Sequence, residues 1–271
     1  MTTLPSLLAV FAHPDDESLV AGGVLARHSA SGARTAVVTA TWADGTWRAR
    51  ELAEALRILG AGEPRMLGYA DAGVPESAPG AARFCDAPLD EVVGRLVAHV
   101  REFRPEVVVT HDAYGNLSGH PDHVHAHRVT VLAVQAAGWG RLYPEAGAPW
   151  QPSALYLATH PDSAAQTLGD VLLRPGREMF SVPDEWVSAV VDVGPWVEQK
   201  LAAIMAHGSE VRRGALPGRL AALPPTVRAR VMSTEWYIRH GAGATVDPTA
   251  SAALRSGAAD AVAWGSAGDR A

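Results

Sequence analysis

Short apolar runs alternate with helical patterns through the first half of the chain, and this alternation constrains the fold more than any other feature. The apolar, β-rich runs predict buried strands at Leu7–Ala12, Arg34–Thr41, Arg65–Tyr69 and Val107–Thr110. Apolar residues at helical spacing predict helices at Leu19–Ser31, Arg48–Leu59, Leu89–Phe103 and Pro121–Ala137. Strands that alternate with helices form a parallel sheet with helices on both faces. The sequence therefore predicts an α/β, Rossmann-like fold with a mostly parallel sheet.

The pattern is looser after Gly138, so we expect an elaborated C-terminal third. Further strands are predicted at Ala154–Ala158 and Val187–Val193, and further helices at Pro195–Ala206 and Leu216–Arg230. Residues 241–271 are rich in glycine and alanine and show little periodicity, which predicts a tail. The expected organisation is one domain over residues 1–240 followed by that tail, since a chain of 271 residues suits a single α/β domain.

Composition excludes several classes of partner and site. A formal net charge of −6 argues against nucleic acids and anionic membranes. No stretch approaches the roughly 20 apolar residues of a membrane span, and the first apolar run is too short for a signal peptide. The single cysteine, Cys85, excludes an intrachain disulfide and a cysteine-rich zinc site. We expect a cytoplasmic protein with a small-molecule partner, and a homo-oligomer stays open.

The first chemistry-bearing motif, His13-Pro14-Asp15-Asp16-Glu17, directly follows the first predicted strand. His13 and Asp16 are three positions apart, a spacing that brings side chains together on a first helical turn. Asp15 lies between them and cannot point the same way. Its carboxylate is therefore left free beside a metal held by its neighbours, where it can accept a proton from water.

The second motif, His120-Pro121-Asp122-His123, follows the fourth predicted strand and a glycine-bearing loop. Ligand sites in open α/β sheets lie at the carboxyl ends of strands, so the two motifs can meet in one crevice. His13, Asp16 and His123 are ligand types that zinc accepts, and three protein ligands leave a fourth position open. His120 can then lie close without binding, with Asp122 placed to fix its tautomer. One zinc ion per chain is expected, although ferrous iron or cobalt could use the same ligands.

Other histidines and glycines near these motifs have simpler explanations. The echo His160-Pro161-Asp162 lacks a second acid or histidine at ligand spacing, so we interpret it as structural. His123 and His127 share the spacing of zinc metalloproteases, but Val124 stands where that motif needs glutamate. The first strand–helix turn has no glycine-rich phosphate loop, which argues against a dinucleotide cofactor.

Together the two motifs resemble the PIG-L (LmbE-like) family of zinc-dependent N-deacetylases, near its mycothiol-pathway and antibiotic amino-sugar branch. Further segments resemble the family at Val37–Gly45, Arg50-Glu51, Leu59-Gly60, Gly68–Gly73, Lys200–Glu210 and Glu235-Trp236. The resemblance extends over roughly residues 5–240, and the two metal motifs are its most specific part.

The resemblance implies a role for each matching position. It implies zinc ligands at His13, Asp16 and His123, a general base at Asp15, an acid or oxyanion-stabilising group at His120 and the partner of that group at Asp122. The implied reaction is attack on an amide carbonyl by water that zinc and Asp15 activate, with His120 assisting collapse to amine and acetate.

Departures from the mycothiol branch bear on the substrate. Ser118 stands where that branch has tyrosine, Ala70 stands where it has arginine before Asp71, and Glu210 replaces its glutamine. These departures leave an antibiotic or another amino-sugar conjugate open. We expect substrate contacts from Trp42, Asp44, Asp71 and Ser118. The rings of Trp42 and Trp47 could pack on a sugar, with core packing as the alternative.

The leading hypothesis is a zinc-dependent hydrolase that removes an N-acetyl group from an N-acetylglucosaminyl-type conjugate. A second hypothesis keeps the metal and cleaves a larger acyl group, as the mycothiol-conjugate amidases of this family do. A third is a catalytically silent metal- or sugar-binding protein. The free carboxylate of Asp15 and the His120–Asp122 pair argue against it, because a silent protein has no need of them.

Overall fold

The computed structural model describes residues 3–172 and 179–241 and places a seven-stranded sheet at their centre. The sheet order is β3-β2-β1-β4-β5-β7-β6. The first five strands are mutually parallel: β1 (Leu7–Phe11), β2 (Thr35–Thr41), β3 (Arg65–Tyr69), β4 (Val107–His111) and β5 (Ala154–Thr159). β7 (Thr234–Arg239) runs antiparallel between β5 and β6 (Ala189–Asp192). The mostly parallel α/β sheet predicted from the sequence is confirmed.

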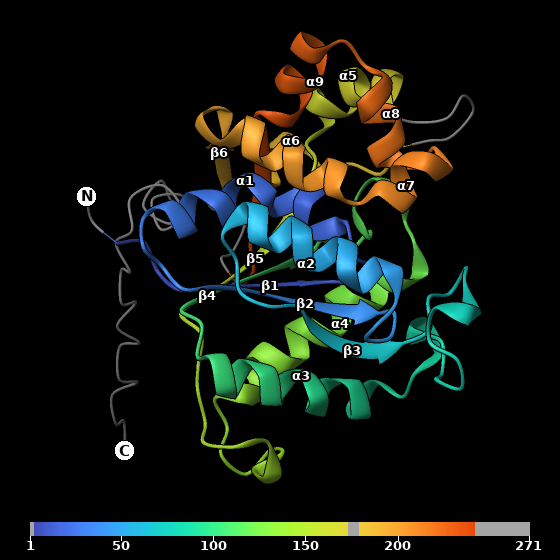
Figure 1. The fold of residues 1–271 in the computed structure, drawn as a ribbon. Coiled ribbons are helices and arrows are strands. Elements are labelled where there is room, and N and C mark those ends of the chain that lie inside the picture. The colour runs from blue at the N-terminus through green and yellow to red at the C-terminus, as the bar shows by residue number, and fades with distance from the viewer. Residues whose placement is uncertain (1–2, 173–178, 242–271) are drawn as a thin grey trace, which may run out of the picture.

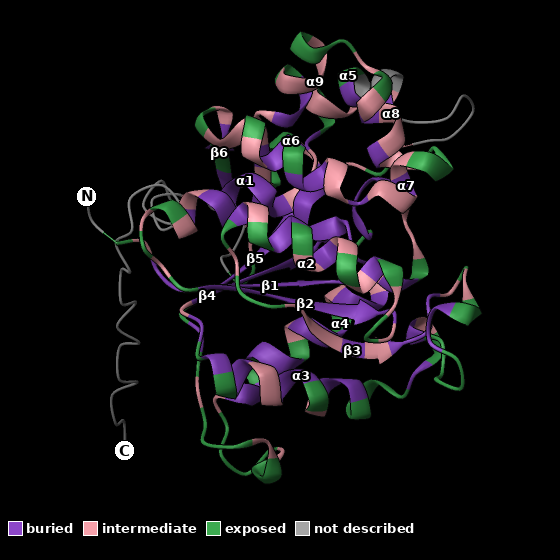
Figure 2. Ribbon diagram, in the orientation of Figure 1, coloured by how far each residue is buried: buried purple, intermediate pink, exposed green. Residues whose placement is uncertain are grey.

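Helices cover both faces of this sheet (Figure 1). One face carries α1 (Asp16–Ala30), α2 (Trp47–Leu59) and α6 (Val197–Ala206), and the other carries α3 (Leu89–Phe103) and α4 (Pro121–Ala137). The central strands are buried throughout, as Figure 2 shows, because both of their faces are covered.

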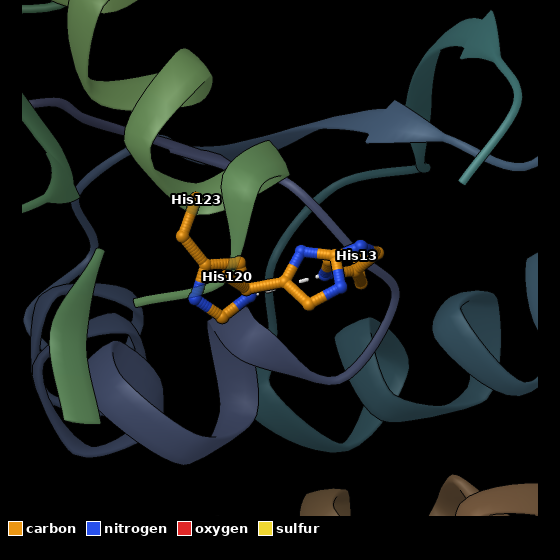
Figure 3. A group of neighbouring side chains, drawn as sticks. All are labelled: His13, His120 and His123. Carbon is orange, nitrogen blue, oxygen red and sulfur yellow. Dashed lines mark hydrogen bonds between the residues drawn. The ribbon is translucent and has the colours of Figure 1, made fainter. Parts of the chain in front are cut away.

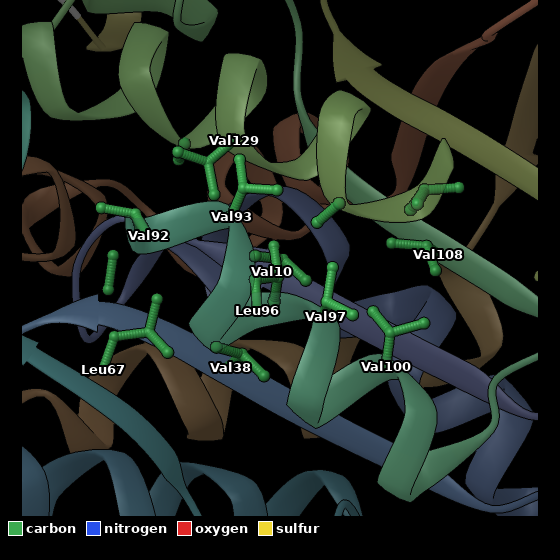
Figure 4. Close-up of a cluster of buried hydrophobic side chains, with 14 of the residues drawn as sticks. Val10, Val38, Leu67, Val92, Val93, Leu96, Val97, Val100, Val108 and Val129 are labelled. Carbon is green, nitrogen blue, oxygen red and sulfur yellow. The ribbon is translucent and has the colours of Figure 1, made fainter. Parts of the chain in front are cut away.

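Alternate residues of the central strands point to opposite faces of the sheet and pack into two separate hydrophobic cores. Leu7, Ala9 and Phe11 of β1 pack with α1, α2 and α6. Leu8 and Val10 pack on the opposite face, where Figure 4 shows Val10 among valines and leucines of α3 and α4. This two-sided burial explains why the first apolar run shows no polar alternation in the sequence.

Besides α6, the described residues after β5 form four short helices, which Figure 1 shows gathered on one side of the sheet. These are α5 (Asp162–Leu172), α7 (Gly208–Arg213), α8 (Leu216–Ala222) and α9 (Pro225–Met232). The single helix predicted over Leu216–Arg230 is two helices, because Pro224 and Pro225 interrupt it and proline cannot continue a helix. α5 and β7 were not predicted. The tail predicted at 241–271 lies outside the described residues except for Gly241.

A buried ion pair ties β7 to the helices on one face. Lys200 of α6 donates to Glu235 of β7, with Nζ and Oε1 2.8 Å apart, and both side chains are almost fully buried. Glu235 also accepts the backbone N–H groups of Gly23 and Val24 in α1, at 2.8 and 3.0 Å. The last described strand therefore anchors the helix that begins at Asp16. None of the described helices is long and apolar enough to cross a membrane.

Candidate metal centre and active site

The two predicted motifs meet at the carboxyl edge of the sheet. The first joins β1 to α1, and the second starts α4 beyond β4, which pairs directly with β1. Pro121 is the first residue of α4, where its missing N–H costs nothing, and the His120 side chain caps that helix. Figure 3 shows His13, His120 and His123 side by side as a result.

Hydrogen bonds to one ring nitrogen of His13 orient the other ring nitrogen toward the centre of this cluster. Its Nε2 lies 3.1 Å from Asp122 Oδ2 and 3.4 Å from Asp71 Oδ2. Carboxylates only accept, so Nε2 carries a proton. Its Nδ1 faces His123 Nε2 at 3.1 Å and Asp16 Oδ2 at 3.4 Å. Ring Nδ1 is therefore the atom of His13 that can bind a metal.

His123 presents its other nitrogen to the same point. Its Nδ1 donates to the backbone oxygen of Gly115 at 3.1 Å, which leaves the Nε2 lone pair facing His13. Asp16 Oδ1 lies 3.3 Å from that Nε2, so the carboxylate offers a different oxygen to each histidine. Tetrahedral zinc with bonds of about 2.0–2.1 Å needs ligand atoms about 3.3–3.4 Å apart. The nitrogens of His13 and His123 lie 3.1 Å apart, and each lies 3.3–3.4 Å from its nearer Asp16 oxygen, which is close to this spacing.

The charges around the cluster favour a cation. Burial lowers the pKa of His13, but hydrogen bonds to Asp122 and Asp16 outweigh burial and raise that pKa to about 10. The surrounding carboxylates thus favour positive charge at His13, which without a metal is carried by a second ring proton and would be supplied by the metal ion in place of that proton. Burial holds the pKa of His123 well below its usual value, so its imidazole stays neutral, as a metal ligand must be. The donor set therefore fits a metal ion.

His111, which sequence reasoning missed, packs behind the cluster at the end of β4. Its ring stacks on His123, with centroids 4.1 Å apart and an interplanar angle of 7°. Its Nε2 lies 3.4 Å from Asp16 Oδ2 but accepts the N–H of Ala12 at 3.2 Å, while Nδ1 bonds Asn116 Oδ1. Its lone pair is thus occupied, and His111 orients His123. The only sequence signal was its position directly after the fourth apolar run.

Asp15 is buried in a strained turn beside the cluster. Its φ of 129° is rare for any residue but glycine, and its N–H donates to Glu17 Oε2 at 2.9 Å. Arg48 Nη2 lies 3.1 Å from Asp15 Oδ1. Burial raises the pKa of the Asp15 carboxyl to about 7, with Arg48 acting in the opposite direction. A group poised near neutrality suits a general base.

Arg48 and Glu210 form a buried pair that sequence reasoning did not identify. Arg48 Nη1 lies 3.2 Å from Glu210 Oε1, and its guanidinium also binds the backbone oxygen of Pro14. Glu210, where the resembled branch has glutamine, thus balances the charge that holds Asp15. No local pattern could have shown this, because the two residues come from α2 and α7.

The Asp122 carboxylate lies closer to His13 than to His120, its predicted partner. His120 Nδ1 accepts the backbone N–H of Asp122 at 3.2 Å, so the helix start fixes the His120 tautomer, with the proton on Nε2. The Asp122 carboxylate is 3.7 Å from His120 but 3.1 Å from His13. It also accepts the N–H groups of Ala72 and Cys85, at 2.9 and 3.0 Å. Asp122 therefore holds His13.

His120 lies against His13 with its rings perpendicular and their centroids 4.6 Å apart. Burial lowers the pKa of His120, and the positive charge of His13 lowers it further. A neutral ring with its proton on Nε2 can donate a hydrogen bond. This arrangement favours the oxyanion-stabilising role among the two that the sequence left open.

The four residues predicted to contact substrate differ in burial and in their distance from the metal cluster. Asp71 is buried within the cluster, beside His13, whereas Asp44 and Ser118 are exposed. Trp42 is only 3% exposed, so its ring is packed in the core and is not a platform for a sugar, while Trp47 is 56% exposed.

His125, His127 and His160 lie outside the groups of the described residues that could hold a metal. His127 Nδ1 donates to the backbone oxygen of His111 at 3.0 Å, and His125 packs edge-on against Phe84. His160 packs near Trp236. His207, whose location the sequence left open, is fully buried with its Nε2 2.9 Å from Glu17 Oε1.

Comparison with known proteins points to one family. The model of the family described as "PIG-L: GlcNAc-PI de-N-acetylase" matches residues 8–134. A 1D-myo-inositol 2-acetamido-2-deoxy-alpha-D-glucopyranoside deacetylase of Rhodococcus jostii (strain RHA1) is 40% identical over 240 residues, covering 76% of this chain and 81% of that protein.

Solved structures share the fold. A conserved protein from Thermus thermophilus matches with a TM-score of 0.60 and 29% identity, over 87% of this chain and 94% of that one. The N,N'-diacetylchitobiose deacetylase of Pyrococcus horikoshii matches with a TM-score of 0.60 and 20% identity, over 87% and 84%. At that lower identity the likeness concerns the fold alone.

Proposed function

The chain belongs to the PIG-L family of GlcNAc-PI de-N-acetylases, and on that premise we propose that it is a metal-dependent N-deacetylase of an N-acetylglucosaminyl conjugate. The observation that carries the proposal is the convergence of His13 Nδ1 and His123 Nε2 on the Asp16 carboxylate. Both nitrogens have their other ring position committed elsewhere, so the two lone pairs face each other across a space that suits a cation.

Zinc is the proposed ion, since imidazole and carboxylate ligands at these separations suit it, although ferrous iron and cobalt accept the same ligands. His13, Asp16 and His123 would hold it, since their ring nitrogens and carboxylate oxygens lie 3.1–3.4 Å apart. When bound, zinc supplies Lewis-acid polarisation of the amide carbonyl and makes water more acidic.

The protein's own groups then move the protons. The Asp15 carboxylate accepts a proton from the attacking water, and Arg48 fixes the orientation of that carboxylate. His120 Nε2–H donates to the carbonyl oxygen as negative charge develops there. The C–N bond breaks as Asp15 returns its proton to the leaving nitrogen, which yields the free amine and acetic acid, and the acid then loses its proton to solvent as acetate.

The proposed substrate is a small amino-sugar conjugate whose aglycone is left open. The Rhodococcus relative is named for an inositol conjugate. Ser118, Ala70 and Glu210 depart from the branch that acts on such conjugates, and Glu210 is engaged with Arg48. The panel that tests the proposal therefore needs several aglycones.

The test is acetate release from N-acetylglucosaminyl conjugates with inositol, glycopeptide and simple alkyl aglycones. Metal-free and zinc-loaded proteins are compared, with Asp15→Asn as the matched control for the base. Zinc-dependent acetate that Asp15→Asn abolishes supports the proposal and ranks the aglycones. Zinc-loaded protein that releases no acetate, but cleaves longer acyl amides, would replace it with an amidase.

A further inference from the structure

Asp15, the proposed base, begins α1 in an unusual way. It is the N-cap residue of that helix, yet its side chain makes no capping hydrogen bond. Its φ of 129° and ψ of −26° lie outside the regions that residues other than glycine favour. Such a conformation persists only where the surrounding structure holds it, and it is often found at functional sites. The contacts that hold this turn therefore decide where the Asp15 carboxylate lies.

Glu17 holds the backbone of this turn. Its Oε2 accepts the N–H of Asp15 at 2.9 Å, and its Oε1 accepts the Ser18 hydroxyl at 2.5 Å. A glutamate that reaches back to the N-cap N–H is a common device at helix starts. Glu17, however, has no exposed surface, and glutamate is almost never fully buried unless it is paired. We therefore looked for the group that pairs with it.

That group comes from far along the chain. His207 Nε2 donates to Glu17 Oε1 at 2.9 Å, and the His207 side chain is fully buried as well. His207 is at once the C-cap of α6 and the N-cap of α7, so it lies at the junction of two helices. This junction fixes one oxygen of Glu17, while the other oxygen of the same carboxylate holds Asp15.

The same junction also holds the Asp15 carboxylate. Glu210 of α7 lies 3.2 Å from Arg48 Nη1, and Arg48 Nη2 lies 3.1 Å from Asp15 Oδ1. The backbone of Asp15 is therefore held through Glu17 and His207, and its side chain is held through Arg48 and Glu210. Two separate chains of contacts that end in one short segment indicate that this segment sets the position of the base.

We propose that Glu17, fixed by His207, is a positioning residue for the base. Its carboxylate holds the Asp15 turn so that the Asp15 side chain lies beside the metal cluster and does not cap α1. Among the described residues, the hydrogen bonds and ion pairs of Glu17 go to Asp15, Ser18 and His207, and none goes to a proposed zinc ligand. Glu17 thus acts on the base and not on the metal. This inference rests on the proposed function.

The first test separates the reach of Glu17 from its charge, in zinc-loaded protein with the best conjugate of the acetate panel. Glu17→Asp keeps the charge but is one carbon too short to bridge Asp15 N and His207. We expect its kcat to fall about 10- to 100-fold, with KM and zinc content unchanged, because a misplaced group costs rate and not binding.

Glu17→Gln is the conservative variant that should rescue the rate. It keeps the reach, so its amide oxygen can accept the Asp15 N–H. Its NH₂ group then faces His207, whose Nδ1 has no partner among the described residues and can take the ring proton. We expect kcat to stay within about fivefold of wild type. If Glu17→Gln were slower than Glu17→Asp, charge and not reach would matter, and the inference would be overturned.

Two comparisons exclude a general effect on α1. Glu235→Gln is the matched control, since Glu235 is another buried carboxylate that accepts N–H groups of this helix, at Gly23 and Val24. Its kcat should stay within about twofold of wild type, because it touches neither the base nor its turn. In an Asp15→Asn background, Glu17→Asp should cost no more than about a further twofold, since it acts through Asp15. An undiminished loss in that background would overturn the inference.

A measurement without turnover separates this inference from the proposed function. Amide hydrogen exchange at Asp15 is followed by NMR in metal-free protein. Protection should persist in Glu17→Gln and Glu235→Gln, and it should fall about tenfold or more in Glu17→Asp. An Asp15 amide that exchanges equally in all of these proteins would overturn the inference. Wild-type protein that hydrolyses no conjugate would instead count against the proposed function, and the exchange result would still decide whether Glu17 holds the turn.

Discussion

Replacing Asp122 with asparagine tests which histidine this carboxylate supports. The structure assigns three N–H donors to it: His13 Nε2 and Ala72 N on Oδ2, and Cys85 N on Oδ1. Asparagine has one acceptor oxygen, so either Cys85 N–H or the other two donors would face an NH₂ group. We expect about 1–3 kcal/mol of lost stability from the unmatched donor.

The metal affinity should fall as well. A carboxylate that holds the far nitrogen of a ligating histidine typically contributes about 10- to 100-fold in metal affinity. Asp122 lies 3.1 Å from His13 Nε2, and Asp71 lies 3.4 Å from the same nitrogen. Because Asp71 can hold His13 in part, we expect the zinc affinity of Asp122→Asn to fall about tenfold to thirtyfold. Competition with a chelator of known zinc affinity measures this directly. Asp71→Asn is the control and should lose less.

The refuting outcome is specific. If Asp122 acted on His120, as the sequence suggested, Asp122→Asn would keep its zinc affinity and lose turnover at saturating zinc. Unchanged affinity in the chelator assay would therefore contradict the assignment of Asp122 to His13.

Three further predictions concern individual side chains. Asp15→Asn should retain zinc, measured by metal analysis, and lose about 10²–10⁴-fold in kcat, so retained turnover would remove Asp15 from the mechanism. His123→Ala should lower the zinc content itself, and full occupancy would point to another ligand. Burial lowers the pKa of His28 to about 4, so the folded protein resists a proton that the unfolded chain takes up below about pH 6.5. The free energy of unfolding should therefore keep the full contribution of His28 above pH 6.5 and fall by about 3 kcal/mol as the pH drops toward 4. Urea unfolding at several pH values measures this, and in His28→Gln the free energy of unfolding should fall less steeply with acid than in wild type.

The sequence predicted the elements whose pattern is local. β3, α3 and α4 have the predicted bounds, because each combines a clear periodicity with flanking proline or glycine. β7 escaped prediction because its sequence TEWYIR has no polar–apolar alternation, and its place between β5 and β6 depends on chain segments far apart in sequence.

The same distinction holds in the candidate site. His13, Asp16 and His123 could be proposed as ligands because their spacing within two motifs, each after a strand, favours their convergence. The partner of Asp122 could not be, because it depends on loops at Ala72 and Cys85 that carry no signal of their own. Hydrogen-bond direction is a property of three-dimensional contacts, and it decides which nitrogen of a histidine is free.

The antiparallel strand β7 completes the sheet although it is the last described strand of the chain. β1 and β4, which precede the two metal motifs, are synthesised first. The outer edge of β5 and the strand β6 both pair with β7, so neither can be paired until β7 is synthesised. Glu235, which fastens α1 and neutralises Lys200, arrives with that strand. Until β7 is in place, α1, whose first residue is the proposed ligand Asp16, lacks its contacts with Glu235, and Lys200 lacks its ion-pair partner.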